Sequence, residues 1–88
     1  MLLNRDETKQ ALEAIAQACY FGATRKHRIL FLLQDQGLDF NASFEFLTIC
    51  LDARLAEAHT DALDPWISVT PFLVSIIANY DELAQDIW

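Results

Sequence analysis

The chain has 88 residues, of which 53% are apolar, and it carries two Gly, two Pro and a formal net charge of −7. This composition excludes a disordered or collagen-like chain, and we expect one small domain spanning residues 1–88. No apolar run reaches the roughly 18 residues of a membrane helix, and the start, charged at Arg5 and without an apolar core, does not fit a signal peptide. We therefore expect a cytoplasmic protein with no membrane contact.

The first predicted helix begins after Asn4, whose side chain suits the N-cap position. Asp6 and Glu7 fall in its first turn, where the helix dipole favours acids, and Gly22 is placed to end it. Apolar residues recur along one side at helical spacing, which predicts an amphipathic helix.

A second helix is predicted from a cap at Thr24 to about Gln36, where Gly37 stops it. Its centre, residues 29–33, is apolar on every side. A helix that is apolar all round is usually buried all round, so we expect this one to be central. A strand is the competing interpretation of the run, but its flanks are good helix formers and no Gly or Pro interrupts it.

Residues 37–40 predict a turn, after which Asn41 or Ser43 is placed to cap a third helix. This helix is expected to extend to about Ala58, with His59 at its negative end. Its apolar residues form two stripes, so we expect packing partners on two sides of it.

The segment from Thr60 to Thr70 contains acids and Pro65, which predict a connection. Thr70 followed by Pro71 is a strong helix start, because Pro is favoured at the first helical position. The fourth helix runs from there toward the C-terminus, with residues 79–81 as a place where it could break. The predicted fold class is all-α, a compact bundle of four to five short helices without a strand.

Two short segments carry a resemblance to a known family. Leu38-Asp39-Phe40 and the following Phe46-Leu47-Thr48 are similar to part of the helical hairpin of chaperone-modulator proteins, which inhibit DnaJ-type cochaperones. The similarity covers less than a third of the chain, and the winged-helix portion of such proteins is not predicted here. We assign no family on this ground.

The apolar content predicts self-association. Six Phe and two Trp are many for a small bundle, and Trp66 and Trp88 fall in a connection and at the last position. Large exposed apolar patches mark interaction surfaces, and two-fold dimers are the commonest oligomers. We therefore expect a homodimer; the alternative is that the two Trp side chains fold back over the ends of the bundle.

Charge is distributed unevenly along the chain. Residues 1–34 carry a net charge of +2, whereas residues 35–88 carry −9, with Arg54 as the only Lys or Arg in that part. Arg25, Lys26 and Arg28 fall in the first turn of the second helix, where cations oppose the helix dipole. Three interpretations remain open: these cations pair with acids of this chain or of its dimer mate, they bind an acidic segment of another protein, or they contact phosphate.

No motif for catalysis or metal binding is present, so we expect a protein that is not an enzyme and has no cofactor. His27 and His59 lie on different predicted helices, and we interpret His27 as a solvated residue at a helix start and His59 as a helix-end residue. Cys19 and Cys50 stand alone among apolar neighbours, which predicts free thiols in the core.

The sequence favours an acidic module that binds and regulates a partner protein through surface complementarity, and its C-terminal acids suit a partner with a basic surface. We expect the contacts to come from aromatic anchors and charged residues. These are Arg25, Lys26, Arg28, Phe44, Asp61, Asp64, Trp66, Phe72 and Trp88.

The alternative is a small inhibitor, of the immunity, anti-restriction or anti-CRISPR type, that blocks the basic surface of a nucleic-acid-binding complex. An acidic stripe would carry this function, formed by Asp52, Glu57, Asp61 and Asp64. Direct nucleic-acid binding through Arg25 and Arg28 is a third hypothesis, disfavoured by the net charge of −7.

Overall fold

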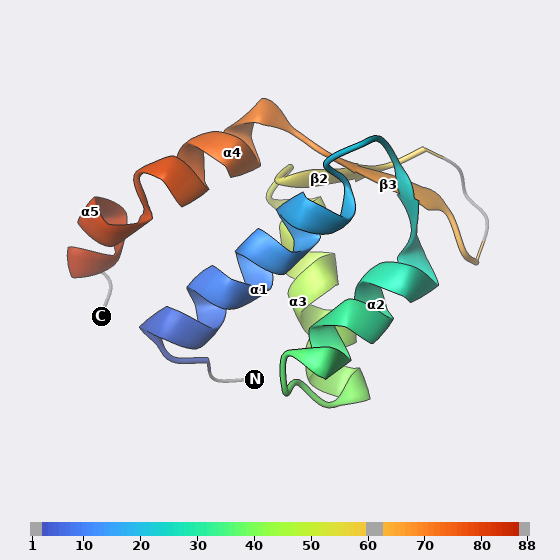
Figure 1. The fold of residues 1–88 in the computed structure, drawn as a ribbon, viewed down its shortest axis with the longest axis horizontal. Coiled ribbons are helices and arrows are strands. Elements are labelled where there is room, and N and C mark those ends of the chain that lie inside the picture. The colour runs from blue at the N-terminus through green and yellow to red at the C-terminus, as the bar shows by residue number, and fades with distance from the viewer. Residues whose placement is uncertain (1–2, 60–62, 87–88) are drawn as a thin grey trace.

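A computed structural model describes residues 3–59 and 63–86, and Figure 1 shows the arrangement of their helices and strands. In the described part of the chain there are five helices and three short strands. In chain order these are α1 (Arg5–Ala18), β1 (Thr24–Arg25), α2 (Lys26–Asp35), α3 (Phe40–Asp52), β2 (Ala56–Ala58), β3 (Trp66–Val69), α4 (Pro71–Ala78) and α5 (Tyr80–Gln85).

The three strands form an antiparallel sheet in the order β1–β3–β2. Thr24 pairs with Ile67 on one side of β3, and Ala58 pairs with the same residue on the other side. Helices α2 and α3 are joined by a tight turn, and the β2–β3 hairpin follows them. The first three helices and the three strands therefore follow one another in the order α1–β1–α2–α3–β2–β3, with β3 at the centre of the sheet.

This finding corrects the predicted all-α fold. The sequence predicts a third helix that extends to about Ala58. In the structure α3 ends at Asp52, and Arg54 turns the chain with a φ of 61°. Leu55 is buried where a helical stripe would also bury it, so the apolar pattern did not distinguish the two conformations. Strands of two to four residues are also too short to show a clear alternation of apolar and polar residues.

The predicted helix starts at Asn4 and Pro71 and the predicted break at residues 79–81 are confirmed, whereas α1 ends at Ala18, four residues before the predicted stop at Gly22. Asn4 caps α1 in a capping box, in which its side chain accepts from the backbone of Glu7 and the Glu7 side chain accepts from the backbone of Asn4. Pro71 opens α4, and Asn79 separates α4 from α5, within the predicted break.

The predicted caps of α2 and α3 are wrong. Thr24 lies in β1, where its hydroxyl donates to the carbonyl of Ala18, and Arg25 takes the N-cap position of α2 without a side-chain bond. The cap of α3 is Asp39, which accepts from the backbone of Ala42. Thr, Asn, Ser and Asp are all suitable caps, so local preference alone did not select among them.

One core lies between the first three helices and the sheet. Ile15 of α1, Ile29 and Leu33 of α2, Leu47 of α3 and Ile67 of β3 are fully buried. Cys19 and Cys50 are free and buried, as predicted. The expectation that α2 is buried all round is wrong, because Phe31 at its centre is 67% exposed.

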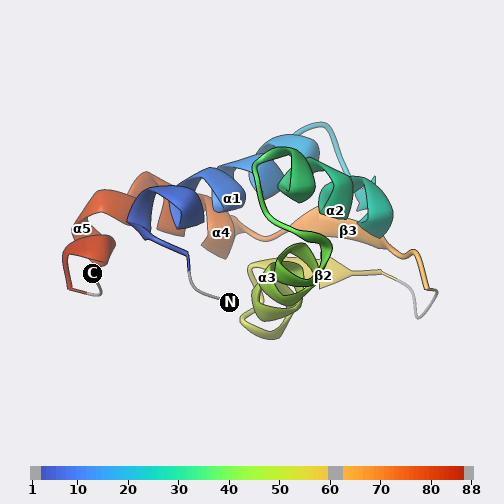
Figure 2. The ribbon, with the colours of Figure 1, turned by 90° about the horizontal axis from the view of Figure 1, so that it is seen from below.

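Helices α4 and α5 contribute Leu73, Tyr80 and Ala84 to the same buried core. Figures 1 and 2 show α4 leaving the sheet, running beside α1 and continuing into α5 near the start of α1. The Tyr80 hydroxyl donates to the carbonyl of Arg5, and Arg5 and Lys9 both approach the Asp81 carboxylate, at 3.4 and 3.5 Å. Among the described residues, no helix is long and apolar enough to cross a membrane.

Candidate protein-interaction surface

Asp64 joins the β2–β3 hairpin to the first turn of α2. Its Oδ1 accepts from the backbone N–H of His27 at 2.9 Å, and its Oδ2 lies 2.6 Å from His27 Nδ1. The Arg25 guanidinium donates to the Asp64 carbonyl at 3.0 Å. Asp64 therefore supplies the N-terminal cap that α2 lacks in its own sequence, and it places an acid where the helix dipole favours one.

The hydrogen bond from the backbone of His27 lowers the pKa of Asp64, and the His27 side chain and Arg25 act in the same direction. The cations at the start of α2 are thus partly compensated within the chain, which supports the first of the three interpretations for Arg25. Neither Lys26 nor Arg28 forms an ion pair with another residue that the structure describes.

Arg25 and Lys26 each lie over one aromatic ring. Arg25 lies over the ring of Trp66, with its guanidinium carbon 4.3 Å from the ring centroid. Lys26 lies over the ring of Phe44 at 4.6 Å, and Phe44 stacks with Phe40 one helical turn earlier at 6.4 Å. These contacts join the hairpin, the start of α2 and the start of α3. We call Arg25, Lys26, Phe40, Phe44 and Trp66 the cation–aromatic surface.

Sequence reasoning proposed nine partner-binding residues, and the structure brings five of them together. Arg25, Lys26, Phe44, Asp64 and Trp66 are linked by the contacts above. Arg28 is adjacent, in a shallow hollow that it lines with Arg25, His27, Phe31 and Leu32.

The other three proposed residues are not placed on this surface. Phe72 lies on α4, and it is 56% exposed there. Asp61 and Trp88 lie outside the described residues.

Two residues of the site were missed or misread. Phe40 was assigned to a turn, but it is the first residue of α3 and 59% exposed. Its spacing of four from Phe44 was the available signal, since residues four apart share a helix face. For His27 the sequence predicts a solvated residue at a helix start, and no local signal indicates that Asp64, 37 residues later, contacts it.

Helix α3 follows α2 across a tight turn, and in proteins that bind DNA through a helix-turn-helix motif the second helix enters the DNA groove. Here it contains no Lys or Arg, and it carries Glu45 and Asp52. Its exposed side chains include Phe40, Phe44 and Ile49. An acidic, aromatic helix is unsuited to a phosphate backbone and resembles the core of a protein interface.

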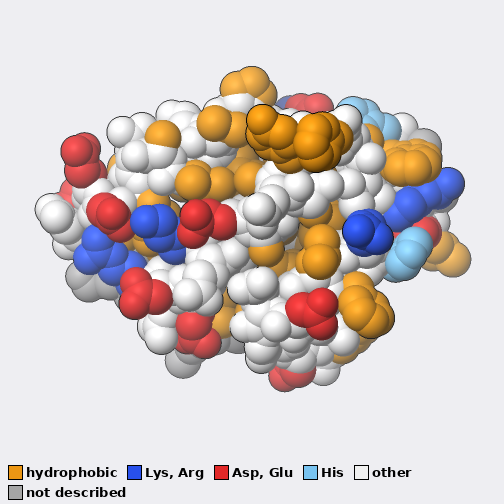
Figure 3. All heavy atoms as spheres, in the orientation of Figure 1, with side chains coloured by type: hydrophobic (Ala, Val, Ile, Leu, Met, Phe, Trp, Pro, Cys, Tyr) orange, Lys and Arg blue, Asp and Glu red, His pale blue; other side chains and the backbone are white. Residues whose placement is uncertain are grey.

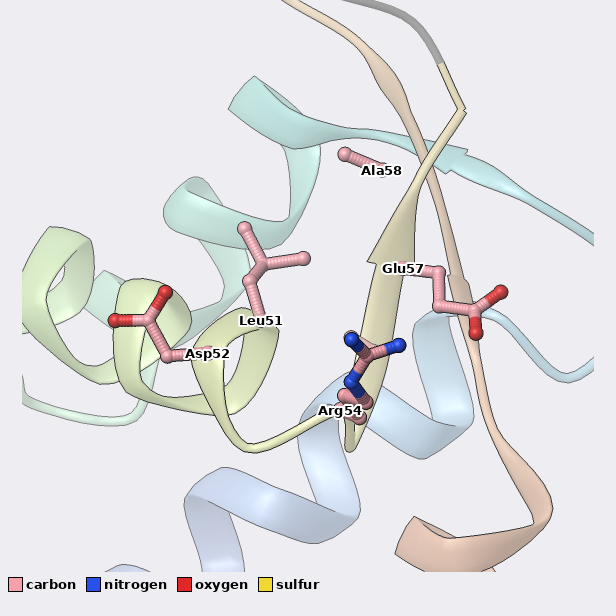
Figure 4. Close-up of a pocket in the computed structure, with 6 residues that line it drawn as sticks. Leu51, Asp52, Arg54, Glu57 and Ala58 are labelled. Carbon is pink, nitrogen blue, oxygen red and sulfur yellow. The ribbon is translucent and has the colours of Figure 1, made fainter.

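The predicted acidic stripe is not a continuous surface among the described residues. Asp64 is engaged with His27, while Asp52 and Glu57 point in opposite directions around a pocket where α3 meets β2 (Figure 4). Arg54 projects between them. No ion pair joins Arg54 to either acid in this part of the structure.

Within residues 3–59 and 63–86, no three His, Cys, Asp or Glu side chains gather closely enough to hold a metal ion. Comparison of the chain with protein-family models, with curated proteins and with solved structures finds no match.

Proposed function

We propose that this protein is a non-enzymatic cytoplasmic module that binds and regulates a partner protein, and that it does so as a homodimer. The cation–aromatic surface is the proposed contact site for the partner. The observation that carries this proposal is the composition of α3, which presents aromatic residues and no cation in the position that DNA-binding domains use for the major groove.

The aromatic residues fit the energetics of protein interfaces. Trp, Tyr and Arg dominate the binding free energy of interfaces, and aromatic residues are enriched at their centres. The Arg25 guanidinium lies over the Trp66 ring, a contact that favours one arrangement of both side chains before a partner arrives. Preorganised side chains lose less entropy on binding, so this pair supports a specific contact.

The inhibitor of a nucleic-acid-binding complex has less support as an alternative. It needs acids at regular spacing on one surface, whereas Asp64 is paired with His27 and Asp52 and Glu57 diverge. The alternative predicts salt-sensitive binding to a nucleic-acid-binding complex in competition with DNA or RNA. Binding that persists at high salt and leaves the nucleic acid in place would contradict it.

Site-specific photo-crosslinking in cells of the source organism tests the proposed function. A benzophenone analogue of phenylalanine is placed at position 40 or, as a matched control, at position 72, because Phe40 and Phe72 are 59% and 56% exposed on different helices. We expect a discrete protein adduct from position 40 that is absent from position 72. Adducts of the same pattern from both positions, or none from position 40, would contradict the proposed surface.

Once the crosslinked partner is identified, affinity is measured with purified proteins. Phe44→Ala is expected to raise the Kd about 30-fold, because truncation of an interface hot spot costs about 2 kcal/mol or more. Phe72→Ala is expected to change the Kd less than about twofold, within the range of residues outside the interface. If Phe72→Ala raises the Kd more than Phe44→Ala does, the partner site lies on α4 instead.

A further inference from the structure

Helix α4 is apolar on every side and yet little of it is covered. Its sequence, Pro-Phe-Leu-Val-Ser-Ile-Ile-Ala, contains no charged residue, and Leu73 is its only buried residue. Val74 is 57% exposed. An apolar helix of this kind is normally covered on all sides, but α4 has α1 along one side only (Figures 1 and 2).

An apolar groove runs between α4 and the C-terminal end of α1. Ala16, Cys19, Tyr20, Val69, Val74 and Ile77 line it, and Gln17 is its one polar side chain. We call these six apolar residues the uncharged face. Tyr20 is 77% exposed and projects beside the groove, so the same face offers both a protruding ring and a hollow.

The groove is formed by the two longest segments of the chain that contain no Asp, Glu, Lys, Arg or His, residues 14–24 and residues 65–80. These segments are far apart in sequence, and the packing of α4 on α1 brings them together. Figure 3 shows apolar side chains gathered over the C-terminal end of α1, with charged side chains toward α5 and the start of α1 and further Lys, Arg and His side chains toward α2. In a molecule of net charge −7, this groove is thus lined only by uncharged residues.

We propose that the occupant of the uncharged face is a second copy of this chain, related by a two-fold axis. A two-fold interface apposes the same surface from both molecules, so an acid placed in it would face an acid. Two copies that each carry −7 also repel one another at long range. A face without charge is what an acidic chain needs for self-association, whereas a partner selected by charge would find no complementary group there.

This inference rests on the homodimer in the proposed function and adds where the interface lies. The uncharged face is formed by α1, β3 and α4, whereas the cation–aromatic surface involves α2, α3 and the hairpin. The dimer would therefore present two partner sites, one on each copy.

The test is light scattering of the purified protein over a range of concentrations, with Val74→Glu and its matched control Ile49→Glu. Val74 and Ile49 are 57% and 55% exposed, and both are aliphatic β-branched residues on helices. We expect a wild-type dimer and an unchanged dimer of Ile49→Glu. For Val74→Glu we expect a dimer Kd at least about 100-fold higher, because each copy would bury an unpaired charge.

Salt separates this interface from one made by opposite charges. From about 50 mM to about 500 mM salt, a dimer on the uncharged face keeps or tightens its association, because only the net repulsion is screened. A dimer in which the Arg25–Arg28 cations meet acids of the mate weakens instead.

Circular dichroism of Val74→Glu and Ile49→Glu confirms that each variant is folded. Tyr20→Ala is a further variant, and we expect it to weaken the dimer as well.

A monomeric wild type, or a dimer that Ile49→Glu disrupts and Val74→Glu does not, would overturn the inference. A dimer that dissociates at high salt would also overturn it. A monomer whose partner binding is lost in Val74→Glu would show that a partner protein covers this face. Crosslinking from position 40 probes α3 alone. It therefore tests the partner site independently, even if this inference about the dimer interface fails.

Discussion

Arg54 adopts the left-handed backbone conformation, with a φ of 61°, where α3 gives way to β2. For a residue with a Cβ atom this conformation costs about 1–2 kcal/mol, and Gly avoids most of that cost. The carbonyl of Arg54 accepts from the Thr70 hydroxyl at 2.7 Å, and the Thr70 backbone donates to Leu55 at 3.1 Å. The strained residue is thus held by the segment that leads into α4.

We expect Arg54→Gly to raise the free energy of unfolding by about 1 kcal/mol, because it relieves the strain and keeps the carbonyl that Thr70 binds. Arg54→Ala retains the Cβ atom and is expected to give no gain. Chemical denaturation of both variants measures the difference. Equal stabilities of the Gly and Ala variants would show that the backbone at this position carries no strain.

At the scale of elements, α2 depends on a residue outside its own sequence. Cations occupy its first turn, and its N-cap residue makes no side-chain hydrogen bond. Asp64, at the end of the hairpin, supplies the acceptor and the negative charge. The hairpin and α2 therefore stabilise one another, and the local rule that α2 breaks is satisfied by tertiary contact.

We expect Asp64→Asn to lower the Tm at neutral pH and Asp64→Ala to lower it further. Asn keeps an acceptor for the His27 backbone but loses the charge, whereas Ala loses both. Because the folded-state pKa of Asp64 is lowered from 3.8, its contribution is fully present above that pH and is lost as the pH falls through the lower folded-state pKa.

Thermal unfolding followed from neutral to acid pH measures this dependence, with Glu57→Gln as the control because Glu57 is an exposed carboxylate on the same hairpin. The Tm difference between wild type and Asp64→Asn should close in acid, and Glu57→Gln should show little difference at any pH. A difference that stays constant into acid would exclude the charge of Asp64 as its cause.

At the scale of the whole molecule, the fold and the charge suggest different functions. Two helices joined by a tight turn also occur in DNA-binding helix-turn-helix motifs, but here the net charge is −7 and α3 contains no cation. Phosphate contacts need clustered Lys and Arg, and two of the candidate groups, Arg25 and His27, are already bonded to Asp64. We give the charge more weight than the topology, because a fold does not by itself imply a function.

We therefore expect no binding to a labelled DNA duplex in fluorescence anisotropy at low salt, up to protein concentrations of about 10⁻⁴ M, the weak end of non-specific affinities. Salt-dependent binding that is lost when Arg25→Ala and Arg28→Ala are combined would contradict this and support a direct nucleic-acid binder. Combined Phe40→Ala and Phe44→Ala is the control that leaves these cations in place.

The sequence by itself determined the helical segments with strong local signals. Asn4 with Glu7, Gly37, and Thr70 with Pro71 act within one helical turn, so they could be recognised without knowledge of the fold. The composition of the candidate site was also predictable in part, because its residues could be recognised individually. They are aromatic residues, and cations in the first turn of a predicted helix.

Only the tertiary structure decided the sheet and the assembly of the site. Strands β1, β2 and β3 are stabilised by pairing between residues up to 43 positions apart in the chain, such as Thr24 and Ile67. Each strand is too short to show a recognisable pattern in the sequence. The cap of α2 likewise comes from Asp64, and the uncharged face forms only when α4 packs on α1. Local signals depend on neighbours in sequence, whereas these features depend on which distant segments share the core.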